Sequence, residues 1–504
     1  MLEIAFSAQL GTAIAVLTRS RGRFGLSLPL LFGLLVYGQV LNYPGAVLGD
    51  ADTYWHVATG RWIIAHGAVP HQDVFSFSMP GAPWDPPEWL AEVFIASVYD
   101  HFGWTALVVV TALCEAGALV LLLRALLRFL APVHAMIAAL LAWAVALTHV
   151  LARPHILTLP ILVLWVAGLV AARSQERRPS FWLAPLMTLW ANLHSSYMLG
   201  LALAGLLVGE AILLAPDRPS RFRALRGWGL FGALSVAAAL ITPFGIHGLI
   251  QPFELTQMSY SSAILVEWMS PNFQHYQPLE LWLMILLFAG LSLGWRLPPT
   301  RVAIVLLLLH MALQHGRHAE PFGFIAPLLL APALAPQLAE RLARRPTSSL
   351  DRGMAELAKP ANARGIALAA AVLLALTVVM LHGGVERNTD KVTPSAALAA
   401  VQALNVTGPV LNDYGFGGYL IFSGIKPFID GRYFYGDAFI RRYIEATNGF
   451  SDQLPVLLDE YGITWTLLNP KTPAVALLDH LPGWRRLHTD DIAVVHVRDV
   501  HTER

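Results

Sequence analysis

The sequence has few charged residues and almost no cysteine. Charged side chains make up 13% of its 504 residues and hydrophobic ones 56%, whereas an ordinary soluble domain is about 25% charged. A soluble chain could not keep so much apolar surface from water, and a disordered chain would be far more polar. The single cysteine, Cys114, excludes an intrachain disulfide and a cysteine-based metal cluster. With a net charge of +1, no global field indicates a nucleic-acid-binding protein.

Long apolar runs dominate the sequence. They recur from Phe24 to about His382 and predict a polytopic α-helical membrane protein with about 11 transmembrane helices. The runs over 181–192 and 302–313 are shorter than the roughly 20 residues that a membrane span needs, so the count is approximate. The predicted spans begin near Phe24, Trp104, Pro132, His155, Phe181, Tyr197, Trp228, Leu281, Val302, Pro321 and Gly365.

Basic residues are concentrated in every second connection between these runs. Because arginine and lysine collect in cytoplasmic loops, the pattern predicts a cytoplasmic N-terminus and an extracytoplasmic position for everything after Gly383. The opposite connections hold only Arg61, Arg153 and Arg317 before the final span. The basic connections are 19–23, 124–128, 173–178, 218–226, 296–301 and 341–364.

Composition divides the chain into two parts. We expect a transmembrane domain over 1–383, with long outer loops at 43–103 and 242–279, and a small extracytoplasmic α/β domain over 384–504. Predicted helices alternate with strands in the second part. The helices are predicted over 394–404, 439–447, 454–461 and 474–481, and the strands over 409–412, 427–430, 464–468 and 493–497.

Two acidic residues open the first outer loop, where the first span reaches the surface. Carboxylates spaced like those of Asp50 and Asp52 can share a divalent cation, or one can ligate while the other acts as a base. The alternative is that the pair caps an interfacial helix. Further acids and tryptophans follow in the same loop, and because ionisable groups at membrane depth usually serve a site, the context favours function. These residues are Trp55, Trp62, Asp73, Trp84, Asp85, Glu88, Trp89 and Glu92.

The other outer connections carry further candidates. Each one singly fits a turn wetted by polar residues, but together they bring carboxylates, imidazoles and two arginines to one leaflet. The combination suits an anionic substrate such as a phosphate, held by arginine, with a metal ion or a general base beside it. The sequence contains neither a P-loop nor an H-E-x-x-H zinc motif. The candidates are Arg153, His155, His194, Glu267, His315, Arg317 and His318.

These features resemble a known superfamily. With Asp50 and Asp52 followed by Tyr54-Trp55-His56 in a long first outer loop, the chain is similar to the GT-C superfamily of membrane glycosyltransferases. That superfamily includes oligosaccharyltransferase catalytic subunits, protein O-mannosyltransferases and lipid A aminoarabinose transferases. The segments 52–60, 84–92 and 417–432 look like an uncharacterised bacterial branch of it. The W-W-D motif with which oligosaccharyltransferases read an asparagine sequon is absent, so another acceptor is expected.

The resemblance implies a reaction and its participants. A hexosyl or pentosyl group would pass from a polyprenyl-phosphate-linked donor to a glycan, lipid or protein acceptor, at the outer face of the bacterial cytoplasmic membrane and without a nucleotide cofactor. Asp52 would be the catalytic base, with Asp50 and Glu267 as further catalytic candidates. By role, the remaining candidates are Arg153, Arg317, His155 and His194 for the donor phosphate, Asp50, Asp52 and His318 for Mg²⁺ or Mn²⁺, and Glu88, Trp89, Tyr54 and His56 for the acceptor side.

The α/β domain has an expected part in this reaction. Gly415-Phe416-Gly417-Gly418-Tyr419 is predicted to be a glycine-rich turn that opens a helix, and Gly431 a turn across which Asp430 and Arg432 pair. We expect the domain to cover the outer mouth of the membrane part and help hold the acceptor, without contributing a catalytic group.

Three other functions stay open. A transporter or flippase for lipid-linked sugars predicts ionisable residues in mid-span, but apart from Glu115, Glu210 and His310 the acids and imidazoles lie at span ends. An O-antigen ligase or polymerase usually carries its large loop late in the chain, whereas here the long acidic loop comes first. A scaffolding membrane protein would leave the polar outer loops unexplained.

Overall fold

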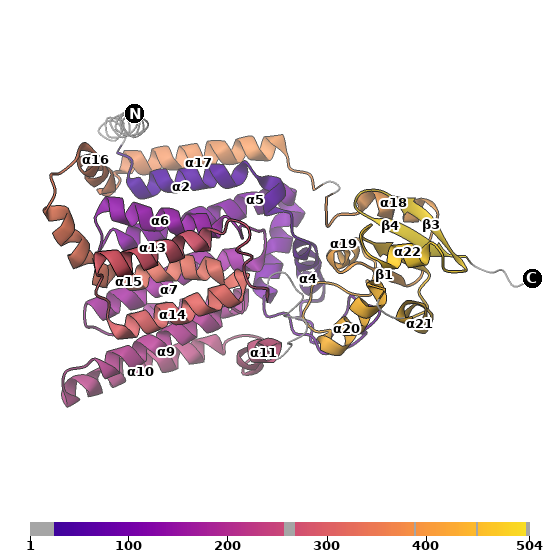
Figure 1. The fold of residues 1–504 in the computed structure, drawn as a ribbon, viewed down its shortest axis with the longest axis horizontal. Coiled ribbons are helices and arrows are strands. Elements are labelled where there is room, and N and C mark those ends of the chain that lie inside the picture. The colour runs from indigo at the N-terminus through magenta and orange to yellow at the C-terminus, as the bar shows by residue number, and fades with distance from the viewer. Residues whose placement is uncertain (1–24, 257–267, 388–389, 450–451, 500–504) are drawn as a thin grey trace, which may run out of the picture.

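The computed structural model describes residues 25–256, 268–387, 390–449 and 452–499. A body of packed helices makes up the larger part, and a small domain with a four-stranded sheet lies beyond one end of it (Figure 1). Helix α4 (Asp52–His66) packs against α5 (Trp89–Leu126) of the body and against α19 (Gly417–Phe422) of the small domain. The acidic residues that open α4 are therefore placed at the junction of the two parts.

Four helices are long and apolar enough to cross a membrane, which makes the chain a multi-pass membrane protein. They are α5, α7 (Pro154–Ser174), α15 (Ala319–Ala343, preceded by the 3-10 turn η3, Gly316–His318) and α17 (Ala363–Gly383). Shorter apolar helices are α2 (Leu28–Leu41), α6 (Pro132–Ala146), α8 (Ala184–Leu193, after the turn η1, Phe181–Leu183), α9 (Tyr197–Leu213), α13 (Pro278–Leu293) and α14 (Pro299–Gln314). The others before the small domain are α3 (Pro44–Val47), α10 (Arg218–Ala239), α11 (His247–Thr256) and α16 (Ser349–Ala358).

The predicted spans all coincide with helices, but their starts differ in places. The first helix begins at Leu28, and the predicted start at Phe24 lies outside the described residues. Helix α5 begins well before Trp104, because helical structure continues through a kink at Gly103 (φ 70°, ψ −167°). Helix α10 includes a basic first half before Trp228, held by the side chain of Asp217 as its N-cap. Of the described helices only four reach span length and hydropathy, so the count of about 11 stays a prediction.

Prolines begin several of these helices. Pro132, Pro154, Pro278 and Pro299 stand in the first turn of α6, α7, α13 and α14, where a missing N–H costs no intrahelical hydrogen bond. The residue before a proline prefers extended backbone, and Arg153 has φ −127° and ψ 163° as the N-cap of α7. The sequence Arg-Pro thus fixes the arginine at the head of a buried helix.

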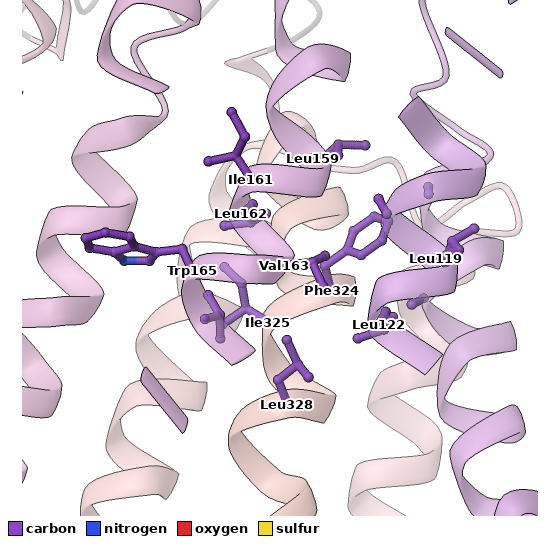
Figure 2. Close-up of a cluster of buried hydrophobic side chains, with 14 of the residues drawn as sticks. Leu119, Leu122, Leu159, Ile161, Leu162, Val163, Trp165, Phe324, Ile325 and Leu328 are labelled. Atoms are coloured by element: carbon purple, nitrogen blue, oxygen red, sulfur yellow. The ribbon is translucent and has the colours of Figure 1, made fainter. Parts of the chain in front are cut away.

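The core of the helical body lies where α5, α7 and α15 meet. Figure 2 shows Leu122 of α5, Val163 of α7 and Phe324 of α15 among the buried side chains there, and each is at most 1% exposed. Helix α5 packs along both α2 and α7, and α2 lies beside α17 at the edge of the body (Figure 1). Contacts of this kind between apolar helices hold α5 and α7 in a fixed relation.

The small domain is a mixed sheet with helices around it. Its strands run in the order β1-β2-β4-β3, with β1 parallel to β2 and the other pairs antiparallel. Residue Val410 of β1 pairs with Trp465 of β2, and Thr466 pairs with His496 of β4. The strands are β1 (Val410–Asn412), β2 (Trp465–Leu468), β3 (Trp484–Thr489) and β4 (Val494–Arg498), and the helices besides α19 are α18 (Ser395–Ala403), α20 (Gly436–Thr447), α21 (Gln453–Glu460) and α22 (Ala474–Leu478).

The structure confirms the four predicted helices of this domain and three of its four predicted strands. The predicted strand over 427–430 is wrong, because the side chain of Asn412 takes the place of a neighbouring strand. Its Oδ1 accepts from the backbone N–H of Phe428 at 2.7 Å and its Nδ2 donates to the carbonyl of Ile429 at 2.7 Å. The missed strand, β3, is an edge strand with a register shift between Arg486 and His488, so it lacks a clear alternation of apolar residues.

Part of the first outer loop crosses to the small domain. The backbone N–H of Phe77 donates to the carbonyl of Pro427 at 3.3 Å, and the hydroxyl of Ser78 donates to the carbonyl of Phe428 at 2.5 Å. Phe77 also packs against the domain's apolar core. The loop that carries the acidic motif is thereby fastened to the segment that carries Asp430 and Arg432.

Candidate active site

The first acidic residue binds the start of α4. The carboxylate of Asp50 accepts a hydrogen bond from the backbone N–H of Asp52 at 2.7 Å, and Ala51, the N-cap residue, makes no side-chain cap. Of the two acids, only Asp50 therefore caps the helix by accepting a hydrogen bond from its first backbone N–H. Asp52 is the first helical residue, and a carboxylate there is favoured by the helix dipole.

Arg153 bridges the two acids from the head of α7. Its Nη1 lies 3.2 Å from Oδ2 of Asp50, and its Nη2 lies 2.6 Å from Oδ2 of Asp52. The arginine is 8% exposed, so solvent screens these ion pairs less than it screens pairs on a surface. The structure thus brings together three residues that the sequence placed in two separate outer loops.

A second polar group lies beside this cluster. Nε2 of His194 is 3.1 Å from Oε1 of Glu88, Nδ1 of His56 is 3.1 Å from Oε1 of Glu92, and Nε2 of His56 is 3.7 Å from Oε2 of Glu88. Burial, and then the nearby positive charge of Arg153, hold the pKa of His56 well below its usual value. A neutral His56 imidazole can donate to one carboxylate and accept from another group, and it brings no charge into the site.

Two further candidates lie around the cluster with other partners. The indole N–H of Trp89 donates to Oδ1 of Asn192 at 2.8 Å. The ring of His155 is 6.3 Å from that of His194, but its Nε2 is directed to the carbonyl of His149 at 3.2 Å. The structure therefore places both residues next to the acidic cluster, each with a hydrogen-bond partner of its own.

Tyr54 belongs to the contact with the linker before the small domain. Its hydroxyl shares a 2.8 Å hydrogen bond with Oγ1 of Thr393, and the guanidinium carbon of Arg387 lies 3.9 Å from the centre of its ring. Burial raises the pKa of the Tyr54 hydroxyl to about 12, so it stays protonated. This geometry gives Tyr54 a structural contact at the position where an acceptor-side residue was predicted.

The candidates of the later outer connections have contacts within their own segments. The guanidinium carbon of Arg317 is 4.9 Å from the centre of a Trp268 ring, and Nδ1 of His318 is 3.3 Å from the carbonyl of Met311. Glu267 lies outside the described residues. Within the ranges that the structure describes, no three His, Cys, Asp or Glu side chains are grouped so that they could hold a metal ion. The Mg²⁺ or Mn²⁺ site and the role of His318 stay predictions.

Sequence reasoning missed part of what surrounds the acid pair. Arg387 donates from Nη2 to the carbonyl of Asp50 at 2.6 Å, and Asp73 lies 2.7 Å from Nη1 of Arg432. The predicted pairing of Arg432 with Asp430 is confirmed, with Nη2 and Oδ2 at 2.7 Å. The sequence signal that pointed to Arg432 was its position in a segment that resembles the superfamily. No feature of the sequence indicates that Arg432 pairs with Asp73.

The fold and the site define a multi-pass membrane protein with a small α/β domain against an acidic, arginine-bridged cluster. No protein-family model and no curated protein matches the sequence. Over most of its length, the chain is similar to solved structures of GT-C membrane glycosyltransferases.

Two proteins represent this similarity. The apo oligosaccharyltransferase of Archaeoglobus fulgidus has a TM-score of 0.47 and 12% identity, over 87% of this chain and 69% of its own. ArnT of Cupriavidus metallidurans has a TM-score of 0.49 and 14% identity in the apo state, over 93% and 97% of the two chains. The structure of the same ArnT bound to undecaprenyl phosphate has a TM-score of 0.46 and 16% identity, over 94% of this chain and 98% of its own. Because these TM-scores are below 0.5, the likeness by itself assigns this chain no donor and no reaction.

Proposed function

We propose that the protein is a membrane glycosyltransferase that moves a sugar from a polyprenyl-phosphate-linked donor to an acceptor at the outer face of the membrane. The observation that supports this most strongly is the bridging of Asp50 and Asp52 by Arg153 at the junction of apolar helices and α/β domain. An arginine suits a lipid-linked phosphate, and a carboxylate suits the activation of a hydroxyl.

The donor phosphate binds at Arg153 in this proposal. A guanidinium presents its N–H donors in a planar fork that matches phosphate oxygens as well as the carboxylates it holds here. In this proposal a phosphate oxygen joins the carboxylates at Arg153 or replaces one of them. His194 lies beside the same cluster: its Nδ1 accepts from the backbone N–H of Ser196 at 3.1 Å, and its Nε2 lies 3.1 Å from Oε1 of Glu88.

The reaction is a substitution at the sugar. The acceptor oxygen forms a bond to the anomeric carbon while the bond from that carbon to the phosphate oxygen breaks, and polyprenyl phosphate leaves with the electron pair. Asp52 takes the proton of the acceptor hydroxyl. Arg153 stabilises the charge that grows on the departing phosphate. Glu88, held by His194, orients the acceptor, and the whole step requires no nucleotide.

A divalent cation remains part of the proposal. Asp50 and Asp52 are the carboxylates that would hold Mg²⁺ or Mn²⁺, and the ion would supply positive charge to the leaving phosphate. In the structure Arg153 already places a positive charge on both carboxylates. The cation and the arginine would therefore stabilise the same negative charge, so the acid pair needs only one of them.

A second candidate is a carrier for lipid-linked sugars, which the buried acids of the helical body favour. Glu115 of α5 is fully buried, and within the described part of the chain neither of its carboxylate oxygens has a hydrogen-bond partner. Glu320 at the start of α15 is 4% exposed, and one of its oxygens has no partner among the residues that the structure describes. Ionisable groups inside a membrane domain are typical of ion and substrate pathways.

A transfer assay separates the two functions. The wild-type protein in nanodiscs is supplied with undecaprenyl phosphate carrying a radiolabelled hexose or pentose and with a membrane extract as the acceptor source. A transferase releases unlabelled undecaprenyl phosphate, and Asp52→Asn abolishes the release while the variant still folds. If the labelled donor only changes leaflet in proteoliposomes and is never cleaved, the protein is a carrier. Full activity in Asp52→Asn would show that Asp52 is not the base.

A further inference from the structure

Two glycines of the α/β domain touch the acidic motif directly. A Cβ atom built on Gly431 would lie 2.1 Å from Oδ1 of Asp52 and 3.2 Å from Nε1 of Trp55, and one built on Gly418 would lie 2.4 Å from the carbonyl oxygen of Ala51. Real Cβ atoms essentially never approach other atoms within 3.0 Å. Only glycine therefore lets the backbone of this domain reach the carboxylate of Asp52.

The turn at Gly431 is fastened to the first outer loop by a buried ion network. The next residue, Arg432, pairs with Asp430 and with Asp73, and none of these three side chains is exposed. Its guanidinium carbon also lies 4.5 Å from the centre of a Trp84 ring. Because Asp73 and Trp84 belong to the same loop as Asp52, the network fixes the Gly431 backbone relative to the acid pair.

The linker before the domain holds the motif from another direction. Nη2 of Arg387 donates to the carbonyl of Asp50 at 2.6 Å, and its guanidinium carbon lies 3.9 Å from the Tyr54 ring centre. Helix α19, which begins with Gly417 and Gly418, packs on α4. Asp50 and Asp52 are thus held by the α/β domain and its linker as well as by Arg153.

We propose that Gly431 is a positioning residue, because its backbone packs against the carboxylate of Asp52 and keeps that carboxylate next to Arg153. This inference rests on the proposed function for its catalytic meaning, and on the structure alone for its geometry. The α/β domain thereby completes the site around the catalytic base, in addition to covering it. A second consequence is that undocking of the domain would release Asp52 from its place.

Gly431→Ala tests the proposal, with Gly415→Ala as its matched control. The new methyl group would lie 2.1 Å from Oδ1 of Asp52, so the carboxylate must move by more than 1 Å before the pair reaches an ordinary contact of 3.4 Å. Gly415 lies in the neighbouring turn, where a Cβ would meet Oδ1 of Asp413 at 3.4 Å, an ordinary contact. We expect Gly431→Ala to lower kcat for sugar transfer by at least about tenfold with an unchanged Kd for undecaprenyl phosphate, and Gly415→Ala to act like the wild type.

Two measurements distinguish positioning from general damage. In a double-mutant cycle measured on the free energy of unfolding, Gly431→Ala should cost less in an Asp52→Ala background than in the wild type, because the truncated side chain no longer meets the new methyl group. Carbodiimide labelling of Asp52, quantified by mass spectrometry, should change in Gly431→Ala and stay at the wild-type level in Gly415→Ala. Wild-type labelling in Gly431→Ala, or additive losses in the cycle, would overturn the inference. A labelling change in a protein that cleaves no donor would instead overturn the proposed function and leave the positioning intact.

Discussion

Replacing Arg153 by lysine separates a phosphate-binding arginine from a simple positive charge. In the structure two different nitrogens of Arg153 hold Asp50 and Asp52, at 3.2 and 2.6 Å. When a phosphate binds, the guanidinium can hold it and still keep a carboxylate, whereas a lysine ammonium is a compact charge without this forked geometry.

The expected loss follows from one charge-assisted hydrogen bond. Such a bond contributes about 1.5–3 kcal/mol, so Arg153→Lys should raise the Kd for undecaprenyl phosphate about tenfold to 150-fold. The assay is equilibrium binding in nanodiscs, with undecaprenol as the ligand that lacks the phosphate. Binding of undecaprenol should change little, because the substitution leaves the apolar helices as they are.

Arg317→Lys is the matched control for this prediction. Arg317 was also predicted to bind the donor phosphate, yet its guanidinium carbon lies 4.9 Å from a Trp268 ring centre, a contact that a lysine ammonium can also make. We expect the Kd of Arg317→Lys to stay within about threefold of the wild type. Normal phosphate binding by Arg153→Lys, together with a large loss in Arg317→Lys, would refute the reasoning and move the phosphate site to the later outer loops.

Three further predictions follow from the same network. Arg432→Met leaves two buried carboxylates unpaired and should lower the free energy of unfolding by about 3–5 kcal/mol in denaturant titrations, whereas Arg442→Met, at an exposed pair, should cost at most about 1 kcal/mol. Asp50→Asn removes a competitor for the arginine and should tighten undecaprenyl phosphate binding several-fold in EDTA, whereas binding weaker than that of the wild type in the presence of Mg²⁺ would instead indicate a bridging metal. Burial keeps His56 neutral in the folded protein, so its contribution to the free energy of unfolding is complete above a pH of about 6.5 and falls as the pH drops below that value. The melting temperature of His56→Gln should therefore fall less than that of the wild type when the pH is lowered from 7.5 to 5.

Much of the fold could be predicted because it depends on local patterns. Apolar runs locate the helices of the body, and turn residues bound the short elements of the α/β domain. The failures occurred where a side chain replaced a regular pattern. Asn412 satisfies the backbone at Phe428 and Ile429 in place of a strand, and no apolar periodicity can reveal a hydrogen bond made by one amide.

The site was predictable in its residue types and less so in its contacts. Asp50, Asp52 and Arg153 stood out because charge is rare in this sequence and each lies at the end of an apolar run. The contact between Asp73 and Arg432 joins residues 359 positions apart, and the approach of Gly431 to Asp52 depends on the absence of a side chain. Neither leaves a pattern in a single sequence.

A structure of the wild-type protein in nanodiscs with undecaprenyl phosphate bound tests the central claim most directly. The account predicts phosphate oxygens within hydrogen-bond distance of the Arg153 guanidinium and beside Asp52, with the Asp52 carboxylate still against the turn at Gly431. A phosphate bound beside Arg317, or inside the helical body near Glu115, would contradict it.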